Sequence, residues 1–176
     1  PEDPLAQNLS GIVSSAMKSL DTDGALAASI QQSKNVVLPL VFDMEATLGK
    51  AEADLPDSVM KGAIPVAPGM DFIASTRAQL PLAALGNAAS AVGFLNQRQD
   101  HVDGVARGDP LLINYDGFWV PNLSLVAATL ALKLTTADLK LQRPGLFQVG
   151  GLKIPVDEYG MVLPQAVVAH LALGAE

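Results

Sequence analysis

The sequence of 176 residues contains no cysteine, few aromatic residues and few charged residues. The absence of cysteine excludes disulfides, thiolate metal sites and a cysteine nucleophile. Only 5% of the residues are aromatic and 16% are charged, whereas 49% are hydrophobic, so Ala, Leu and Val must supply most of the core. This content is typical of a packed domain and excludes a disordered chain.

Positive charge and long apolar runs are also scarce. The chain has 11 Lys and Arg against 18 Asp and Glu, a net charge of -7, and nucleic-acid binding needs clustered positive charge, so no nucleic-acid partner is expected. The run closest to a membrane-spanning helix, residues 80–95, is interrupted by Pro and Gly. Because the chain begins at Pro1 without Met or a basic leader, we expect a fragment of a larger protein whose membrane anchor lies outside it.

Hydrophobic spacing predicts two helices at the start of the chain. Residues 8–20 carry apolar side chains at helical spacing, so we expect a helix whose apolar stripe faces a core. A second, short helix should follow Asp23 as its N-cap and cover residues 25–33, with Leu26 and Ile30 on its buried side. Both helices would then precede the first strand.

Two apolar runs predict strands, each after a helix. Residues 35–43 are rich in β-branched side chains, which indicates a strand buried on both faces, with a bend or an unpaired side at Pro39. Residues 44–81 mix Gly, Pro and acidic residues, as is typical of a long surface excursion. Pro81 suits the first position of a helix through residue 90, and residues 91–96 indicate a second core strand. This alternation favours an α/β layer.

The second half of the chain predicts antiparallel strands around one helix. Residues 105–115 favour a strand, and the turn signal Asp116-Gly117 joins it to another strand in a hairpin. Short apolar runs over residues 139–163 indicate small antiparallel strands. We therefore expect a single α/β domain over residues 1–176, with a mixed sheet, helix–strand repeats in the first half and antiparallel strands in the second. The helix predicted over residues 122–134 has a buried side formed by Leu123, Val126, Ala127, Leu130 and Leu134.

The most concentrated polar segment, residues 97–109, lies between two apolar runs. A histidine with two nearby carboxylates suits acid–base chemistry or metal binding, so a small metal-dependent hydrolase would use His101, Asp100 and Asp103. A catalytic zinc site needs three protein ligands, which requires all three side chains to converge. The structural alternative is a tight turn at Asp103-Gly104 that Asp100 caps, with Arg107 in an ion pair with one of the carboxylates.

Other candidate features are weaker. Trp119 is the only tryptophan, and it could stack on a ligand or fill the core between the hairpin and the following helix. The sequence has no serine nucleophile elbow, P-loop, dinucleotide-binding glycine fingerprint or HExxH motif. An enzymatic role is therefore not expected for this chain, and neither a cofactor nor a metal is expected.

Five ordered segments carry a family resemblance. They are ALAASIQQSKNVVLPLVFD at 25–43, AVGFLN at 91–96, DHVDGVARGDPLLI at 100–113, VPNLSLVAATLAL at 120–132 and KIPVDEYG at 153–160. In this order they resemble the extracellular sensor domains of the CHASE class, second type. The resemblance carries over Asp103, Gly104 and Arg107 in a D-x-x-DGV-x-R turn, which we interpret first as architecture and second as a ligand contact.

The resemblance implies an extracytoplasmic sensor in a bacterial inner-membrane receptor. Membrane helices would flank the domain, and the cytoplasmic output would be an adenylate or guanylate cyclase, a histidine or serine/threonine kinase, or a diguanylate cyclase. The signal would be an unknown small molecule or protein, and a homodimer is expected. The family pattern also has an earlier helix and buried strand, which this chain lacks, and a final strand unlike residues 161–167. The alternatives are the hydrolase described above and a free periplasmic binding protein.

Overall fold

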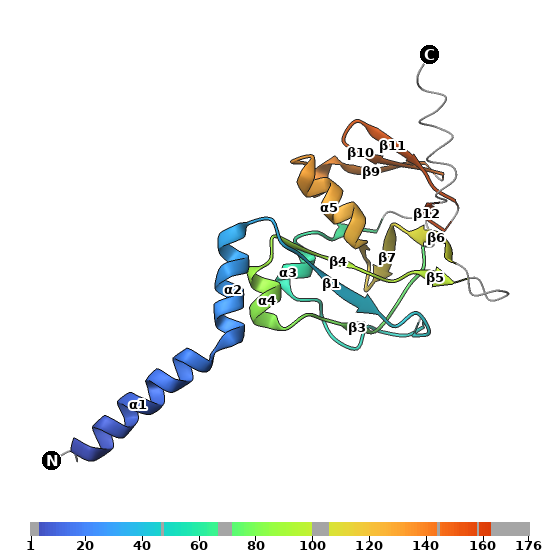
Figure 1. The fold of residues 1–176 in the computed structure, drawn as a ribbon. Coiled ribbons are helices and arrows are strands. Elements are labelled where there is room, and N and C mark those ends of the chain that lie inside the picture. Colours follow the sequence, from blue (N-terminus) through green and yellow to red (C-terminus); the bar gives the residue numbers. More distant parts are fainter. Residues whose placement is uncertain are drawn as a thin grey trace.

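Helices and strands alternate in the first half of the chain and antiparallel strands dominate the second, as the sequence predicts (Figure 1). The computed structural model describes residues 4–46, 48–66, 72–99, 106–143, 145–157 and 159–162. The fold is α/β with several small sheets. In chain order the elements are α1 (Pro4–Leu20), α2 (Thr22–Ser33), β1 (Val37–Phe42), α3 (Asp57–Met60), β2 (Ile64–Pro65), β3 (Ala78–Gln79), α4 (Ala83–Ala88), β4 (Ala91–Phe94), β5 (Arg98–Gln99), β6 (Ala106–Pro110), β7 (Leu112–Tyr115), β8 (Phe118–Pro121), α5 (Leu123–Ala131), the 3₁₀ helix η1 (Thr136–Asp138), β9 (Leu139–Arg143), β10 (Leu146–Val149), β11 (Leu152–Pro155) and β12 (Met161–Val162).

The first sheet is mixed and has the order β3-β1-β4. Its central strand, β1, alternates between buried Leu40 and Phe42 and exposed Val41. The prediction that this strand is buried on both faces is therefore wrong, because core side chains cover only one of its faces. Pro39 lies opposite Gly93 of β4, and β3 pairs with β1 only beyond that point. Pro39 thus has the unpaired side that its missing N–H requires.

The helix α1 forms where the apolar spacing predicts it, but its apolar stripe does not face a core. Leu9, Ile12 and Met17 are 61%, 63% and 69% exposed, respectively. Figure 1 shows α1 extending away from the rest of the described structure. The prediction that this stripe faces a core is wrong. Periodicity defines a helix and its apolar side, but the direction of the helix decides whether another element covers that side.

The helix α2 differs from its prediction at the N-terminus and on one face. Its N-cap is Asp21 and not Asp23, because the Asp21 side chain accepts a hydrogen bond from the Gly24 N–H at 2.9 Å. Ile30 is buried as predicted, whereas Leu26 is 49% exposed. α2 packs mainly on α4, and this single neighbour covers only a narrow strip of the helix.

The segment between β1 and α4 is more structured than a surface excursion. It contains α3, β2 and β3, and Val59 of α3 has no exposed surface. The prediction is therefore wrong for α3 and β3, which contribute to the core and to the first sheet. The helix α4 is shorter than predicted, and β4 lies where the AVGFLN run predicts a strand.

The β7–β8 hairpin separates two core clusters. One of its faces contributes Ile113, Tyr115 and Val120 to the first core cluster, which also contains Leu40, Phe42, Val59, Val92 and Phe94. Its other face contributes Leu112 and Trp119 to the second core cluster, with Leu111, Leu125, Leu139, Phe147, Val149 and Val156. The strand predicted over residues 105–115 is divided into β6 and β7.

The hairpin turn has the backbone that its sequence predicts. Asp116 and Gly117 have φ values of 48° and 81°. Two residues with positive φ are typical of the tight turn that matches the twist of paired strands. The predicted hairpin is therefore confirmed.

The helix α5 is fixed at its N-terminus by Asn122. The buried Asn122 side chain accepts from the Leu125 N–H at 2.7 Å and donates to the Pro110 carbonyl at 3.0 Å. β4 passes so close that a Cβ at Gly93 would lie 2.9 Å from the Leu123 Cα. The predicted helix is confirmed, but its fully buried positions are Leu125, Val126 and Thr129. Ala127 and Leu130 are exposed, because the helix is rotated relative to its most apolar side.

The C-terminal strands form the predicted small antiparallel sheets. β9, β10 and β11 make one sheet, and β12 pairs with β6 in another. In Figure 1, α5 lies between the β9–β10–β11 sheet and the β1–β4 pair. Within the described residues, no helix has the length and apolar character needed to cross a membrane.

Candidate ligand site

The polar segment that the sequence indicates as a candidate site, residues 97–109, lies partly outside the described residues. Asp100, His101, Asp103 and Gly104 fall there, so the metal site and the capped turn both stay predictions. Arg107 lies in β6, which pairs with β5 on one side and β12 on the other. In the part of the chain that the structure describes, no three His, Cys, Asp or Glu residues are grouped so that they could hold a metal ion.

Trp119 lies in the second core cluster and is 3% exposed. Its ring centroid is 5.0 Å from that of Phe72, and its Nε1 has no hydrogen-bond partner among the described residues. The Oδ1 of Asn114, the cross-strand partner of Trp119, likewise has no hydrogen-bond partner within the described part of the chain. Of the two roles considered for Trp119, this burial fits the filling of the core. Stacking of Trp119 on a ligand stays a prediction.

A cleft of about 260 Å³ lies beside α5. Its lining residues adjoin both core clusters, because Leu139 belongs to the second cluster and Ser58 precedes Val59 of the first. The cleft therefore lies where the two halves of the fold meet. It is lined by Ser58, Lys61, Gly62, Ser90, Ala91, Pro121, Val126, Thr129, Leu130, Leu134, Thr135, Thr136 and Leu139.

Backbone contacts at helix ends position the cleft walls. The Asn122 cap and the close approach of Gly93 hold the first turn of α5 against β4. Asp138 closes a capping box on η1, because its carboxylate accepts from the Thr135 N–H at 2.8 Å and from the Thr135 hydroxyl at 2.9 Å. The Thr135 N–H and hydroxyl lower the pKa of Asp138. Local hydrogen bonds and close packing therefore fix the position of both walls.

The lining of the cleft combines apolar and polar side chains. Val126, Leu134 and Leu139 are apolar, whereas Lys61 and several hydroxyl groups are polar, including Thr135 and Thr136 directly after Leu134. Lys61 forms no ion pair with any described residue. The hydroxyls of Ser58, Ser90 and Thr136 likewise have no hydrogen-bond partner within the described ranges. The arrangement provides unused donors and one positive charge next to an apolar surface.

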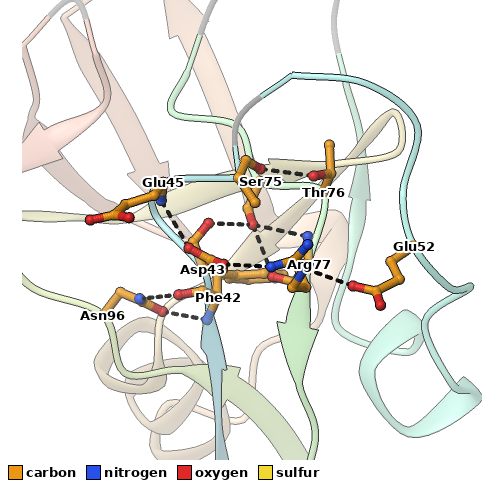
Figure 2. A network of polar contacts seen from close by, with 9 residues as sticks. Phe42, Asp43, Glu45, Glu52, Ser75, Thr76, Arg77 and Asn96 are labelled. Carbon is orange, nitrogen blue, oxygen red and sulfur yellow. Dashed lines mark hydrogen bonds and ion pairs between the residues drawn. The ribbon is translucent and has the colours of Figure 1, made fainter.

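A polar network at the C-terminal end of β1 is the second cluster of interest (Figure 2). The Asn96 side chain accepts from the Phe42 N–H at 2.8 Å and donates to the Phe42 carbonyl at 2.7 Å. Arg77 pairs with Asp43 at 3.3 Å and Glu52 at 2.7 Å. These contacts continue the β1–β4 pairing beyond its last residue and connect it to residues 43–52.

The network uses its own polar groups, which favours a structural role. The Ser75 hydroxyl lies 2.9 Å from the carbonyls of both Asp43 and Arg77, and the Thr76 hydroxyl donates to Ala46 (Figure 2). Arg77 is 62% exposed and already engages two carboxylates. Exposed ion pairs of this kind contribute roughly 0–1 kcal/mol. We therefore regard the cleft beside α5, and not this network, as the candidate ligand site.

Sequence reasoning found neither feature. The cleft draws its residues from α3, β4, α5 and the segment around η1, which are far apart in the chain. The available signals were indirect: Lys61-Gly62 follows a short helix, and hydroxyl residues cluster at Thr135-Thr136. Neither pattern has a characteristic spacing, so only the fold brings them together.

One comparison with known proteins gave a match. The family model for the CHASE2 domain matches residues 4–171, which is nearly the whole chain. No curated protein and no solved structure matched. The resemblance deduced from the ordered segments is therefore confirmed by a match that also includes α1.

Proposed function

The chain belongs to the CHASE2 domain family, whose members are extracellular sensor domains of signalling receptors, and from this we propose that it senses the signal of a bacterial inner-membrane receptor. The cytoplasmic output would be a nucleotide cyclase, a protein kinase or a diguanylate cyclase. The domain itself would bind and transmit and would not catalyse. Family membership supports the sensor role, and the cleft supports direct binding of a chemical signal.

The position of the cleft suggests how binding could produce a signal. A ligand shifts a conformational equilibrium only if it binds one state more tightly. The cleft has α5 and Leu139 on one side and the residues around α3 and β4 on another. A ligand that contacts both sides stabilises one arrangement of the two halves, and the flanking membrane segments would carry that change to the output domain.

The sequence around the domain in its gene tests the receptor assignment. We expect an apolar membrane-spanning segment on each side and an output domain beyond one of them. Phosphatase fusions at the end of the domain should be active, because that reporter folds only outside the cytoplasm. A gene without flanking apolar segments, or an inactive fusion, would contradict the receptor assignment and favour a free binding protein.

Thermal unfolding with a panel of metabolites and metal ions tests direct chemical sensing. A ligand that binds only the folded state raises the unfolding midpoint with concentration. A saturable rise with one compound supports a chemical sensor. If no compound shifts a well-folded sample, the domain senses a protein partner or the membrane state instead.

We also propose a homodimer joined through α1. Leu9, Val13, Ala16 and Leu20 follow one another at spacings of four, three and four residues, as in helices that pair side by side. These four side chains form a stripe that is exposed along α1. Lys18 is the only charged residue between Pro4 and Leu20. Two copies can therefore approach through this face with little charge repulsion, although the whole chain carries a net charge of -7.

A further inference from the structure

We propose that the cleft beside α5 binds a small carboxylate with a short apolar tail, and that Lys61 pairs with the carboxylate group. This inference rests on the proposed sensor function and specifies the chemical class of its signal. Three observations carry it: the size of the cleft, the apolar lining from α5 and the segment after it, and the unused polar groups in the same lining.

The size of the cleft limits the ligand. A volume of about 260 Å³ is below the usual range of roughly 300–1,000 Å³ for drug-sized ligands. It exceeds the roughly 150 Å³ that is enough for benzene in an apolar cavity. The part of a ligand that the open cleft can enclose is therefore somewhat larger than a single aromatic ring and smaller than a nucleotide.

The apolar lining of the cleft requires a hydrophobic tail. The accessible apolar surface comes mainly from Leu130, which is 39% exposed, and from the half-buried Leu134, because Val126 and Leu139 are already buried. Each methylene group that a ligand buries against this surface should tighten binding about four-fold. A ligand with a tail of a few carbon atoms would therefore bind. A fully polar metabolite would gain nothing from this apolar surface.

The polar lining sets the charge of the ligand. Lys61 is the one basic residue among the described lining residues, and none of them is Asp or Glu. A cationic ligand would meet the Lys61 ammonium group there and no carboxylate in the lining itself, because the Asp138 carboxylate is already engaged by Thr135. One ammonium group suits a single carboxylate, and the hydroxyl of Ser58, three residues before Lys61 on α3, lies on the same side of that helix. Phosphate is usually bound by several cationic or backbone donors.

Binding of hexanoate to the purified domain, measured by calorimetry, tests the proposal. Hexanoate should bind saturably, 1-hexanol should bind more weakly, and hexylammonium should not bind. Acetate and inorganic phosphate should also fail to bind because they have no apolar tail. This set separates the contribution of the charge from that of the tail.

Two variants locate the site. Lys61→Met keeps the side-chain stem and removes the charge, so hexanoate affinity should fall about five-fold, as expected for one exposed ion pair. Lys153→Met removes an exposed lysine that does not line the cleft and should leave hexanoate affinity unchanged. Thr136→Phe, which fills the cleft from its half-buried rim, should abolish binding of both hexanoate and hexanol. An unchanged unfolding midpoint without ligand establishes that each variant is folded.

The outcomes distinguish this proposal from the proposed function. If hexanoate does not bind, or if Lys61→Met and Lys153→Met bind it equally, the carboxylate proposal is overturned. The receptor assignment then still stands or falls on the flanking membrane segments. If hexylammonium binds as tightly as hexanoate, the assigned charge is wrong.

Discussion

Asn122 shows how one side chain connects a helix end to a neighbouring strand. It caps α5 through the Leu125 N–H and holds the Pro110 carbonyl, and all these groups are buried. Loss of a cap costs about 1 kcal/mol, and each unpaired buried polar group costs roughly 1–3 kcal/mol. Asn122→Ala should therefore lower the free energy of unfolding in urea by about 2–4 kcal/mol.

The variant Asn122→Ser is the matched control for this prediction. Its hydroxyl can still cap the helix through the Leu125 N–H but is too short to replace the hydrogen bond to Pro110, so its effect should be intermediate. An Ala variant as stable as the wild type would show that Asn122 does not fix the start of α5.

Trp119 contributes by filling volume and not by hydrogen bonding. Its Nε1 is buried and has no partner in the described ranges, and its ring packs against Phe72. Trp119→Phe removes an unsatisfied donor and should cost about 1 kcal/mol, whereas Trp119→Ala should cost roughly 3–5 kcal/mol through the cavity that it leaves. Equal losses of unfolding free energy in the two variants would mean that Nε1 has a partner in solution.

Asp138 makes the stability of η1 depend on pH. Hydrogen bonds from the Thr135 N–H and hydroxyl lower the pKa of Asp138 in the folded state below the ordinary 3.8. Its contribution is therefore fully present above the unfolded-state pKa and is lost as the pH falls through the lower, folded-state pKa. Asp138→Ala should lower the unfolding midpoint at pH 7, and the difference from the wild type should disappear in strong acid. A difference that persists there would exclude the ionised cap as its cause.

At the scale of elements, the hairpin turn that orients the two core faces depends on Gly117. Its φ of 81° is a conformation that costs other residues roughly 1–2 kcal/mol. Gly117→Ala should lower the unfolding free energy by about that amount. Gly151→Ala is the control, because a Cβ there meets nothing within 4 Å, and it should change stability little.

The elements also show what sequence patterns can and cannot predict. The alternation of helices and strands, the hairpin at Asp116-Gly117 and the strands after residue 139 depend on local spacing and turn chemistry, and they were predicted. The buried faces of β1 and α5 and the exposure of α1 were not. Those features depend on which distant element covers a surface, and in α5 the Asn122 cap and the contact at Gly93 set the rotation of the helix.

At the scale of the whole molecule, the same limit applies to the site. The sequence pointed to the contiguous segment 97–109, because titratable residues that are close in sequence are easy to recognise. The cleft instead combines Lys61, at the end of α3, with Leu134 and Leu139, which follow α5 in the chain. Its residues are ordinary in isolation, and only the fold brings them together where the two core clusters meet.

The stripe on α1 gives the last prediction, which concerns association of whole chains. Sedimentation of the purified domain should show a dimer that dissociates on dilution. Leu9→Glu combined with Leu20→Glu places charges along the exposed stripe and should give a monomer with an unchanged fold. Ser14→Glu adds a charge on the other side of α1, by helical spacing, and should leave the dimer intact. A wild-type monomer at every concentration, or equal loss of the dimer with Ser14→Glu, would show that α1 does not join two copies through this stripe.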